Sequence, residues 1–298
     1  VHHMEPDHAA CIAEFLLRYP DVTIVCNAKT QAMIAEFFGA KAALNVRTVT
    51  EQDTLETGRH SFRFVFAPMV HWPEVMVSFD VTDGTLFSAD AFGTFGALDG
   101  NLFADEINFV SEKLPEARRY YANIVGKYGA PVQALLKKAA ALPVKTVCPL
   151  HGPVWRENIA WFVDKYDKWS SYTPEENAVT IFYGSVYGHT QEAAEILASC
   201  LADLEVKNIK VYDVSAQHSS YLVAEAFRCS HLVFASSTYN AGIFENMDIL
   251  IDDLIKHALQ NRKVALIENG SWASTAGMLM KEKLSKCKNT EFIGDVVT

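Results

Sequence analysis

Hydrophobic and polar positions follow two different patterns along the chain, and the change falls near residue 170. After it, short apolar runs typical of buried strands alternate with segments of helical periodicity. This regular alternation predicts a doubly wound parallel sheet with helices on both faces. The predicted strands are Val179–Tyr183, Ile209–Tyr212, Leu232–Ala235 and Lys263–Ile267, and the predicted helices are Thr190–Leu204, Tyr221–Arg228, Asn246–Leu259 and Thr275–Lys286.

Before residue 170 the pattern is mixed and predicts an α/β domain of a different kind. Helices are predicted at Asp7–Arg18, Gln31–Phe38, Asp105–Ala141 and Ile159–Trp169, and strands at Val22–Cys26, Leu44–Val49, Phe62–Phe66, Val75–Phe79, Thr85–Ser88 and Val144–Cys148. The polar stretch 170–177 contains Pro174 and predicts a linker. A length of 298 residues also favours two domains. The predicted domains are residues 1–170 and 177–298.

Composition narrows the classes of partner and compartment. The 36 acidic residues exceed the 26 basic ones, giving a net charge of −10 that argues against nucleic acid and anionic membranes as partners. A basic protein partner remains possible. No apolar run is long enough for a membrane span. The six cysteines form no C-x-x-C pair and indicate a reducing, cytoplasmic environment.

A dense group of potential metal ligands lies close to the first residue. His3, Glu5, Asp7 and His8 fall within six positions. Three more candidates follow predicted strands, where side chains from different strands can meet: His71, Asp90 and His151. A tag remnant could explain His2 and His3 but not the two carboxylates in register. Imidazoles and carboxylates together predict a metal site.

The order of these residues resembles the binuclear site of metallo-β-lactamase-like domains. Hydrolytic members of that superfamily carry a second histidine at the position of Glu5, which suits zinc. Three carboxylates facing four imidazoles suit two iron ions that change oxidation state. The resemblance implies that Asp90 bridges the metals, that His8 is the least certain ligand, and that two trios each hold one iron: His3, Glu5 and His71, and Asp7, His8 and His151. It also makes His3, Glu5, Asp7, His71, Asp90 and His151 the catalytic set.

Three loops in the second half predict a flavin site. Each follows a predicted parallel strand, at the sheet edge where such folds bind ligands. The first loop lacks the lysine of a triphosphate-binding loop and suits a terminal monophosphate held by hydroxyls, backbone N–H groups and a helix start, so it resembles the FMN loop of flavodoxins. The other two place an aromatic residue beside small ones, as a flat isoalloxazine requires, although Trp272 could instead be a core residue. The candidate FMN-binding residues are Ser185, Val186, Tyr187, Gly188, His189 and Thr190; Ser237, Thr238, Tyr239, Asn240, Ala241 and Gly242; and Gly270, Ser271, Trp272 and Ala273.

Together the two halves resemble a flavodiiron protein, with a metallo-β-lactamase-like αββα domain followed by a flavodoxin-like domain. The resemblance implies a cytoplasmic oxidoreductase with FMN and two iron ions, which reduces dioxygen to water, nitric oxide to nitrous oxide, or both. It also implies electron transport from a rubredoxin-type donor and a head-to-tail homodimer. Rubredoxins are themselves acidic, and so is this chain. Binding such a donor would therefore require a local basic patch, for which Lys113, Arg118 and Arg119 are candidates.

The chain departs from the resemblance at both ends. It starts at the metal motif, so the first domain is expected to be N-terminally incomplete, and it ends at Val296–Thr298, in what is expected to be the last strand of the second domain, without a closing helix. Two other interpretations therefore stay open. One is a dinuclear zinc hydrolase with an accessory flavodoxin domain. The other is an electron-transfer module that binds FMN while its metal site stays empty.

Overall fold

Two units with separate cores make up the chain in the computed structural model, which describes residues 1–43 and 45–298. The first unit comprises Val1–Ala117 and Tyr128–Asp167, and the second comprises Arg118–Lys127 and Lys168–Thr298. The sequence places a boundary after residue 170, so residues 168–170 and the segment Arg118–Lys127 are the differences. Arg118–Lys127 belongs to the second unit, where Tyr172 donates a hydrogen bond to the carbonyl of Gly126 at 2.9 Å.

The first unit is built on a five-stranded sheet of order β3-β4-β5-β6-β7. Its strands are β3 (Thr54–Thr57), β4 (His60–Phe66), β5 (Met76–Asp80), β6 (Thr85–Phe87) and β7 (Thr146–Cys148). β4 and β6 are each antiparallel to β5, and β7 is parallel to β6. Strands β4, β6 and β7 therefore run in one direction and end at the same edge of the sheet.

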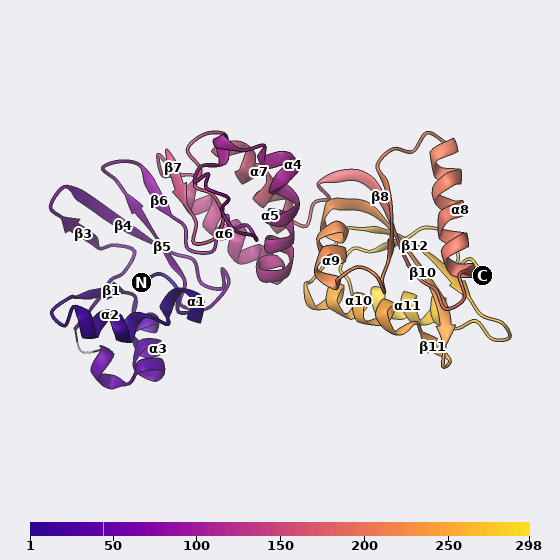
Figure 1. The fold of residues 1–298 in the computed structure, drawn as a ribbon, viewed down its shortest axis with the longest axis horizontal. Coiled ribbons are helices and arrows are strands. Elements are labelled where there is room, and N and C mark those ends of the chain that lie inside the picture. The colour runs from indigo at the N-terminus through magenta and orange to yellow at the C-terminus, as the bar shows by residue number, and fades with distance from the viewer. Residues whose placement is uncertain (44) are drawn as a thin grey trace. The chain divides into compact units, whose positions relative to one another are not determined.

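A smaller parallel sheet of β1 (Ile24–Cys26) and β2 (Val46–Thr48) belongs to the same unit, drawn in indigo to magenta in Figure 1. Met4, Cys26 and Ile34 are fully buried in its core. The helices of this half of the chain are α1 (Pro6–Ala9), α2 (Ile12–Arg18), α3 (Ala28–Phe38), α4 (Phe109–Glu112), α5 (Leu114–Tyr120), α6 (Gly129–Ala139) and α7 (Ile159–Ser170), with shorter turns η1 (Ala40–Ala43), η2 (Ala104–Glu106), η3 (Tyr121–Val125) and η4 (Gly126–Tyr128).

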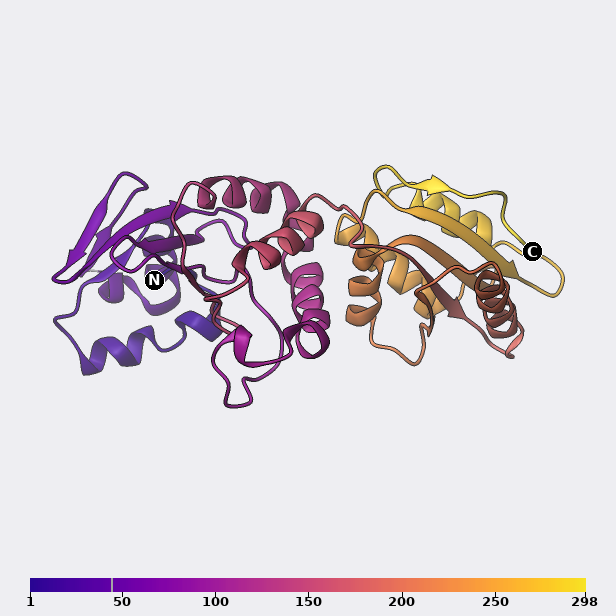
Figure 2. The ribbon, with the colours of Figure 1, turned by 90° about the horizontal axis from the view of Figure 1, so that it is seen from above.

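The second unit holds a sheet of order β13-β12-β10-β8-β9, all parallel, with the short β11 added antiparallel to β10. Figures 1 and 2 show helices on both faces of this sheet, in orange to yellow. Helix α8 covers one face, and its Ala194 is buried against Ile181 and Val233. The elements are β8 (Glu176–Gly184), α8 (His189–Asp203), β9 (Ile209–Asp213), α9 (Ser219–Arg228), β10 (Cys229–Tyr239), β11 (Gly242–Ile243), α10 (Glu245–Lys256), β12 (Lys263–Asn269), α11 (Ala276–Leu284) and β13 (Glu291–Phe292).

Most predicted elements are present, and the long predicted helices are the main errors. The helix expected at Asp7–Arg18 is two short helices separated at Ala10 and Cys11. The one expected at Asp105–Ala141 is divided into six segments of different helical type; the side chain of Asn108 caps the start of α4, and the backbone of Tyr128 leaves the helical conformation (φ −104°, ψ 36°) before α6. The strands β3, β11 and β13 were not predicted. Leu44, the first residue of a predicted strand, lies outside the described residues. None of the described helices combines the length and apolar character that a bilayer crossing requires.

Candidate functional site

The predicted metal ligands converge at one edge of the first unit's sheet. His71, Asp90 and His151 follow β4, β6 and β7, the three strands that end at this edge. The remaining four predicted ligands lie in or just before the short helix α1, which begins at Pro6: His3, Glu5, Asp7 and His8. His3 and His151, which are 148 positions apart in the sequence, both lie near Asp90 here. All seven predicted ligands are brought together.

Asp90 lies at the centre of the group, with each carboxylate oxygen facing different histidines. Its Oδ2 is 3.1 Å from Nε2 of His3 and 3.2 Å from Nε2 of His71. Its Oδ1 is 3.0 Å from Nε2 of His8 and 3.5 Å from Nε2 of His151. The side chain is fully buried. One carboxylate that presents separate oxygens to two pairs of imidazoles has the geometry of a bridge between two metal positions.

The other two carboxylates sort the histidines in the same way. Oε2 of Glu5 is 3.0 Å from Nε2 of His71 and 3.4 Å from Nε2 of His3. Asp7 places Oδ2 at 3.2 Å from Nε2 of His151 and Oδ1 at 3.5 Å from Nε2 of His8. These carboxylate–imidazole contacts follow the two trios that the resemblance implied, although His8 also lies close enough to His3, Glu5 and Asp90 to share a metal ion with them.

Two atoms at the centre of the group lack a hydrogen-bond partner that satisfies them. Nε2 of His3 and Oδ2 of Asp90 are buried, and neither makes a hydrogen bond of good geometry. Buried polar atoms of this kind are rare unless an ion or water satisfies them. Burial by itself lowers the pKa of His3, but the contacts with Asp90 and Glu74 outweigh it and raise the pKa to about 9. Metal binding would therefore displace a proton from this ring.

Glu74 is a functional candidate that the sequence reasoning missed. Its Oε1 lies 2.7 Å from Nδ1 of His3 and accepts a hydrogen bond from the backbone N–H of Met4 at 2.9 Å. The residue is 1% exposed. A carboxylate on the far nitrogen of a metal-binding histidine fixes the ring and raises its basicity. The only sequence signal was its position three residues after His71.

Backbone strain accompanies the ligand loops. Three non-glycine residues beside His71 and Asp90 have a positive φ: Met69 at 67°, Ala89 at 52° and Phe92 at 69°. Such conformations cost energy and persist where the surrounding structure holds them for a purpose. Trp72 adds a side wall, because its ring meets that of His3 edge-on at 5.2 Å between centroids.

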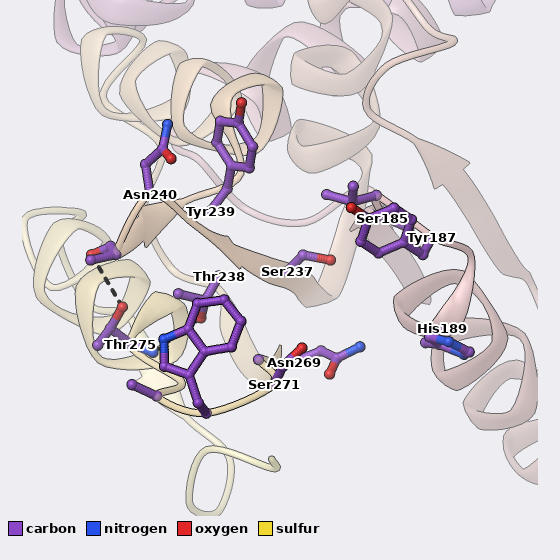
Figure 3. Close-up of a pocket in the computed structure, with 15 residues that line it drawn as sticks. Ser185, Tyr187, His189, Ser237, Thr238, Tyr239, Asn240, Asn269, Ser271 and Thr275 are labelled. Carbon is purple, nitrogen blue, oxygen red and sulfur yellow. Dashed lines mark hydrogen bonds between the residues drawn. The ribbon is translucent and has the colours of Figure 1, made fainter.

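A cavity of about 470 Å³ lies in the second unit, at the carboxyl ends of β8, β10 and β12. Figure 3 shows side chains from all three following loops around it. Asn269 and Thr275 line the cavity but were missed by the sequence reasoning, whereas Gly188, Thr190 and Gly242 were predicted but do not line it. The predicted residues that line it are Ser185, Val186, Tyr187, His189, Ser237, Thr238, Tyr239, Asn240, Ala241, Gly270, Ser271, Trp272 and Ala273.

The loop before α8 has the shape of a phosphate cradle. Gly188 has a φ of 92° and donates its N–H to Oγ of Ser185 at 3.0 Å, which turns the chain into the helix. Thr190 is buried behind this turn, with its hydroxyl 2.8 Å from that of Ser237 and accepting from Asn269 Nδ2 at 3.4 Å. These hydrogen bonds join all three loops, so Gly188 and Thr190 help to fix the form of the cavity although they do not line it.

The aromatic residues of the cavity are exposed. Trp272 is 93% exposed, Tyr187 88% and Tyr239 48%. The alternative interpretation of Trp272 as a core residue is therefore wrong. Exposed aromatic rings at the rim of a cavity with polar loops suit a flat, partly polar ligand such as an isoalloxazine.

Comparisons with known proteins agree with both halves of this description. Residues 1–152, half of the chain, match the model of the ODP family beta lactamase, and residues 181–291 match the flavodoxin model. The anaerobic nitric oxide reductase flavorubredoxin of Vibrio vulnificus is 30% identical over 278 residues, which are 91% of this chain and 55% of the relative. The chain belongs to the ODP beta-lactamase family, and it is a flavodiiron protein. It spans about half the length of the curated relatives it matches.

Solved structures of flavodiiron proteins share the fold. The rubredoxin oxygen:oxidoreductase of Desulfovibrio gigas has a TM-score of 0.89 at 25% identity, covering 100% of this chain and 75% of that one. The flavodiiron protein of Giardia intestinalis has a TM-score of 0.90 at 23% identity, covering 99% and 73%, which shows the fold alone. The predicted fold class is confirmed. Membership of the flavodiiron family assigns FMN and a diiron centre to this chain, and the two sites described above fit them.

Proposed function

We propose that the chain is the core of an oxidoreductase that reduces dioxygen to water, nitric oxide to nitrous oxide, or both. The observation that carries the proposal is the position of Asp90 between two trios of nitrogen and oxygen ligands. Glu5, in place of a second histidine, completes a mixed ligand set that suits redox-active iron better than a hydrolytic zinc pair. The names of the relatives, a nitric oxide reductase and an oxygen oxidoreductase, support both gases as substrates.

Each ligand has a defined task in this proposal. When bound, the iron ions would supply a binding place and electrons for the gas, and FMN would supply further electrons. His3, Glu5 and His71 would hold one ion, Asp7, His8 and His151 the other, and Asp90 both. Glu74 would keep the ring of His3 in the orientation that points Nε2 inward. Ser185, Thr190 and the N-terminus of α8 would position the flavin's phosphate end.

The partners are also proposals. A rubredoxin-type donor and a head-to-tail homodimer would complete the electron path. The contacts of Lys113, Arg118 and Arg119 make them a weak basic patch: Lys113 pairs with Asp99 at 3.6 Å, Arg118 is buried against Glu175 at 2.6 Å, and Arg119 lies over the ring of Tyr221 at 4.0 Å. The donor would instead meet the exposed aromatic rim near Trp272. The cytoplasm is the proposed compartment, since all six cysteines are free thiols.

Cofactor stoichiometry tests the proposal first. Elemental analysis and the visible spectrum should give two irons and one FMN per chain. The chemically reduced protein should then consume dioxygen or nitric oxide at an electrode, and Asp83→Asn, a surface control, should match the wild type. Two zinc ions that resist exchange for iron would support the hydrolase instead. Normal FMN with little metal in protein supplied with iron would support the electron-transfer module. Light scattering and reduction by a purified rubredoxin test the partners.

A further inference from the structure

The flavin cavity holds a single basic side chain. Fifteen residues line it, and among these described residues none is Lys, Arg, Asp or Glu. His189 alone can carry a positive charge there. The terminal phosphate of FMN bears nearly two negative charges near neutral pH, and the chain itself carries a net charge of −10. Without a local cation, the phosphate would depend on backbone dipoles in an unfavourable field.

His189 lies where that phosphate is expected. It is the first residue of α8, a helix of 15 residues whose free N–H groups and positive end favour anions. It directly follows Gly188 in the cradle-shaped loop. Figure 3 shows His189 on the same side of the cavity as Ser185 and Tyr187, away from Asn240 and Thr275.

The imidazole is free to turn toward a ligand. Its side chain is 76% exposed, and its charged neighbour is Glu192 on the same helix, with Nδ1 and Oε2 4.0 Å apart. At that distance and exposure the pair is weak. The groups that face the cavity from the other two loops, Ser237 and Asn269 among them, carry no charge. A phosphate would therefore compete only with one solvated carboxylate for the ring.

We propose that His189 recognises the phosphate of FMN and makes the chain prefer FMN over riboflavin in a pH-dependent way. The inference rests on the proposed flavin site and adds its selectivity. Histidine changes charge between about pH 5 and 8. An imidazole forms an ion pair with a phosphate only while the ring is protonated, so we expect the preference for FMN to weaken as the pH rises.

Flavin binding to the apoprotein tests this without any activity assay. FMN and riboflavin would each be titrated at pH 6, 7.5 and 9, with binding followed by quenching of flavin fluorescence. At pH 6, His189→Asn should weaken FMN binding by about threefold to tenfold, the range of an exposed to half-buried charge pair. At pH 9 the variant and the wild type should agree, and riboflavin binding should be unchanged at every pH.

Two further variants sharpen the outcome. His189→Lys keeps a charge at all three pH values and should bind FMN tightly even at pH 9. His218→Asn removes another exposed histidine, at the start of α9, and should behave as wild type. Equal FMN affinity of His189→Asn and wild type at pH 6 would overturn the inference, as would equal losses for FMN and riboflavin. Failure of the wild type to bind either flavin would overturn the proposed flavin site itself.

Discussion

Oε1 of Glu74 lies 2.7 Å from Nδ1 of His3, on the opposite side of the ring from Asp90. This contact ties the loop between β4 and β5 to the segment before α1. Glu74→Gln keeps the size of the side chain but weakens the charge that supports His3. We expect iron affinity to fall by about 10-fold to 100-fold, with FMN content unchanged.

Competition with a calibrated chelator measures the iron affinity in that variant. Glu56→Gln, an exposed change on the neighbouring strand β3, serves as the control. Wild-type iron affinity in Glu74→Gln would contradict the role of Glu74 in orienting the ring.

The bridging position of Asp90 predicts a larger effect. In Asp90→Asn, one of the two oxygens becomes an amide nitrogen that cannot ligate a metal ion, so one side of the bridge is lost. We expect most of the iron to be lost while one FMN per chain remains, as measured by elemental analysis and the visible spectrum. Two irons retained in this variant would refute the bridge.

Gly152, directly after His151, offers a steric test of the site. It has a φ of 83°, and a Cβ at this position would lie 2.7 Å from Cβ of Thr94. Gly152→Ala should lower stability by about 1–3 kcal/mol beyond the conformational cost and displace His151. Gly58→Ala is the matched control, because Gly58 has a φ of 70° with nothing within 4 Å, and should cost only about 1–2 kcal/mol.

Urea unfolding and iron content together report on the Gly152 pair of variants. The expected result is loss of both stability and iron in Gly152→Ala, but loss of stability alone in Gly58→Ala. Equal behaviour of the two variants would show that the close contact with Thr94 does not position His151.

Glu225 predicts how acid affects the second unit. Burial raises the pKa of this carboxyl, but the contact with Arg228 at 2.6 Å outweighs it and holds the pKa below its ordinary value. A carboxyl whose pKa is lowered by folding stabilises the protein at pH values above its ordinary pKa, which is near 4.3. This stabilisation is lost as the pH falls through the pKa of the group in the folded state. Glu225→Gln should therefore cost about 1.5–3 kcal/mol at pH 7 and progressively less below pH 4.

Urea midpoints between pH 3 and 7 check that trend. Glu192→Gln, an exposed glutamate on α8, should stay within about 0.5 kcal/mol of wild type throughout. A cost for Glu225→Gln that does not depend on pH would assign the effect to packing instead of charge.

The clustering of the candidate metal ligands could be predicted from sequence, because four of them lie in one short motif and the other three obey a simple rule of sheets. His71, Asp90 and His151 follow strands, and parallel strands end at one edge. Glu74 obeys no such rule. It lies in a loop and acts through His3, so its role can be recognised only in the structure, where the two side chains are in contact. Asn269 was missed for a similar reason, since its contact with Thr190 links two loops that are distant in sequence.

The elements that failed show where local pattern is insufficient. Residues 105–141 have helical composition, but they form six segments of different helical type, and the backbone changes conformation at positions such as Asn108 and Tyr128. Part of that region, Arg118–Lys127, even belongs to the second unit. Hydrophobic periodicity predicts that a residue is in a helix. It does not say which core the helix joins.

The spread of the metal ligands along the chain has a consequence for folding. They come from four separate segments, between His3 and His151, so bound ions would act as cross-links that close loops of up to nearly 150 residues. Closing a long loop removes much of the entropy of the unfolded chain, as a disulfide does. Iron would then stabilise the fold of this protein as a cross-link, and resistance to heat would rise with each ion bound.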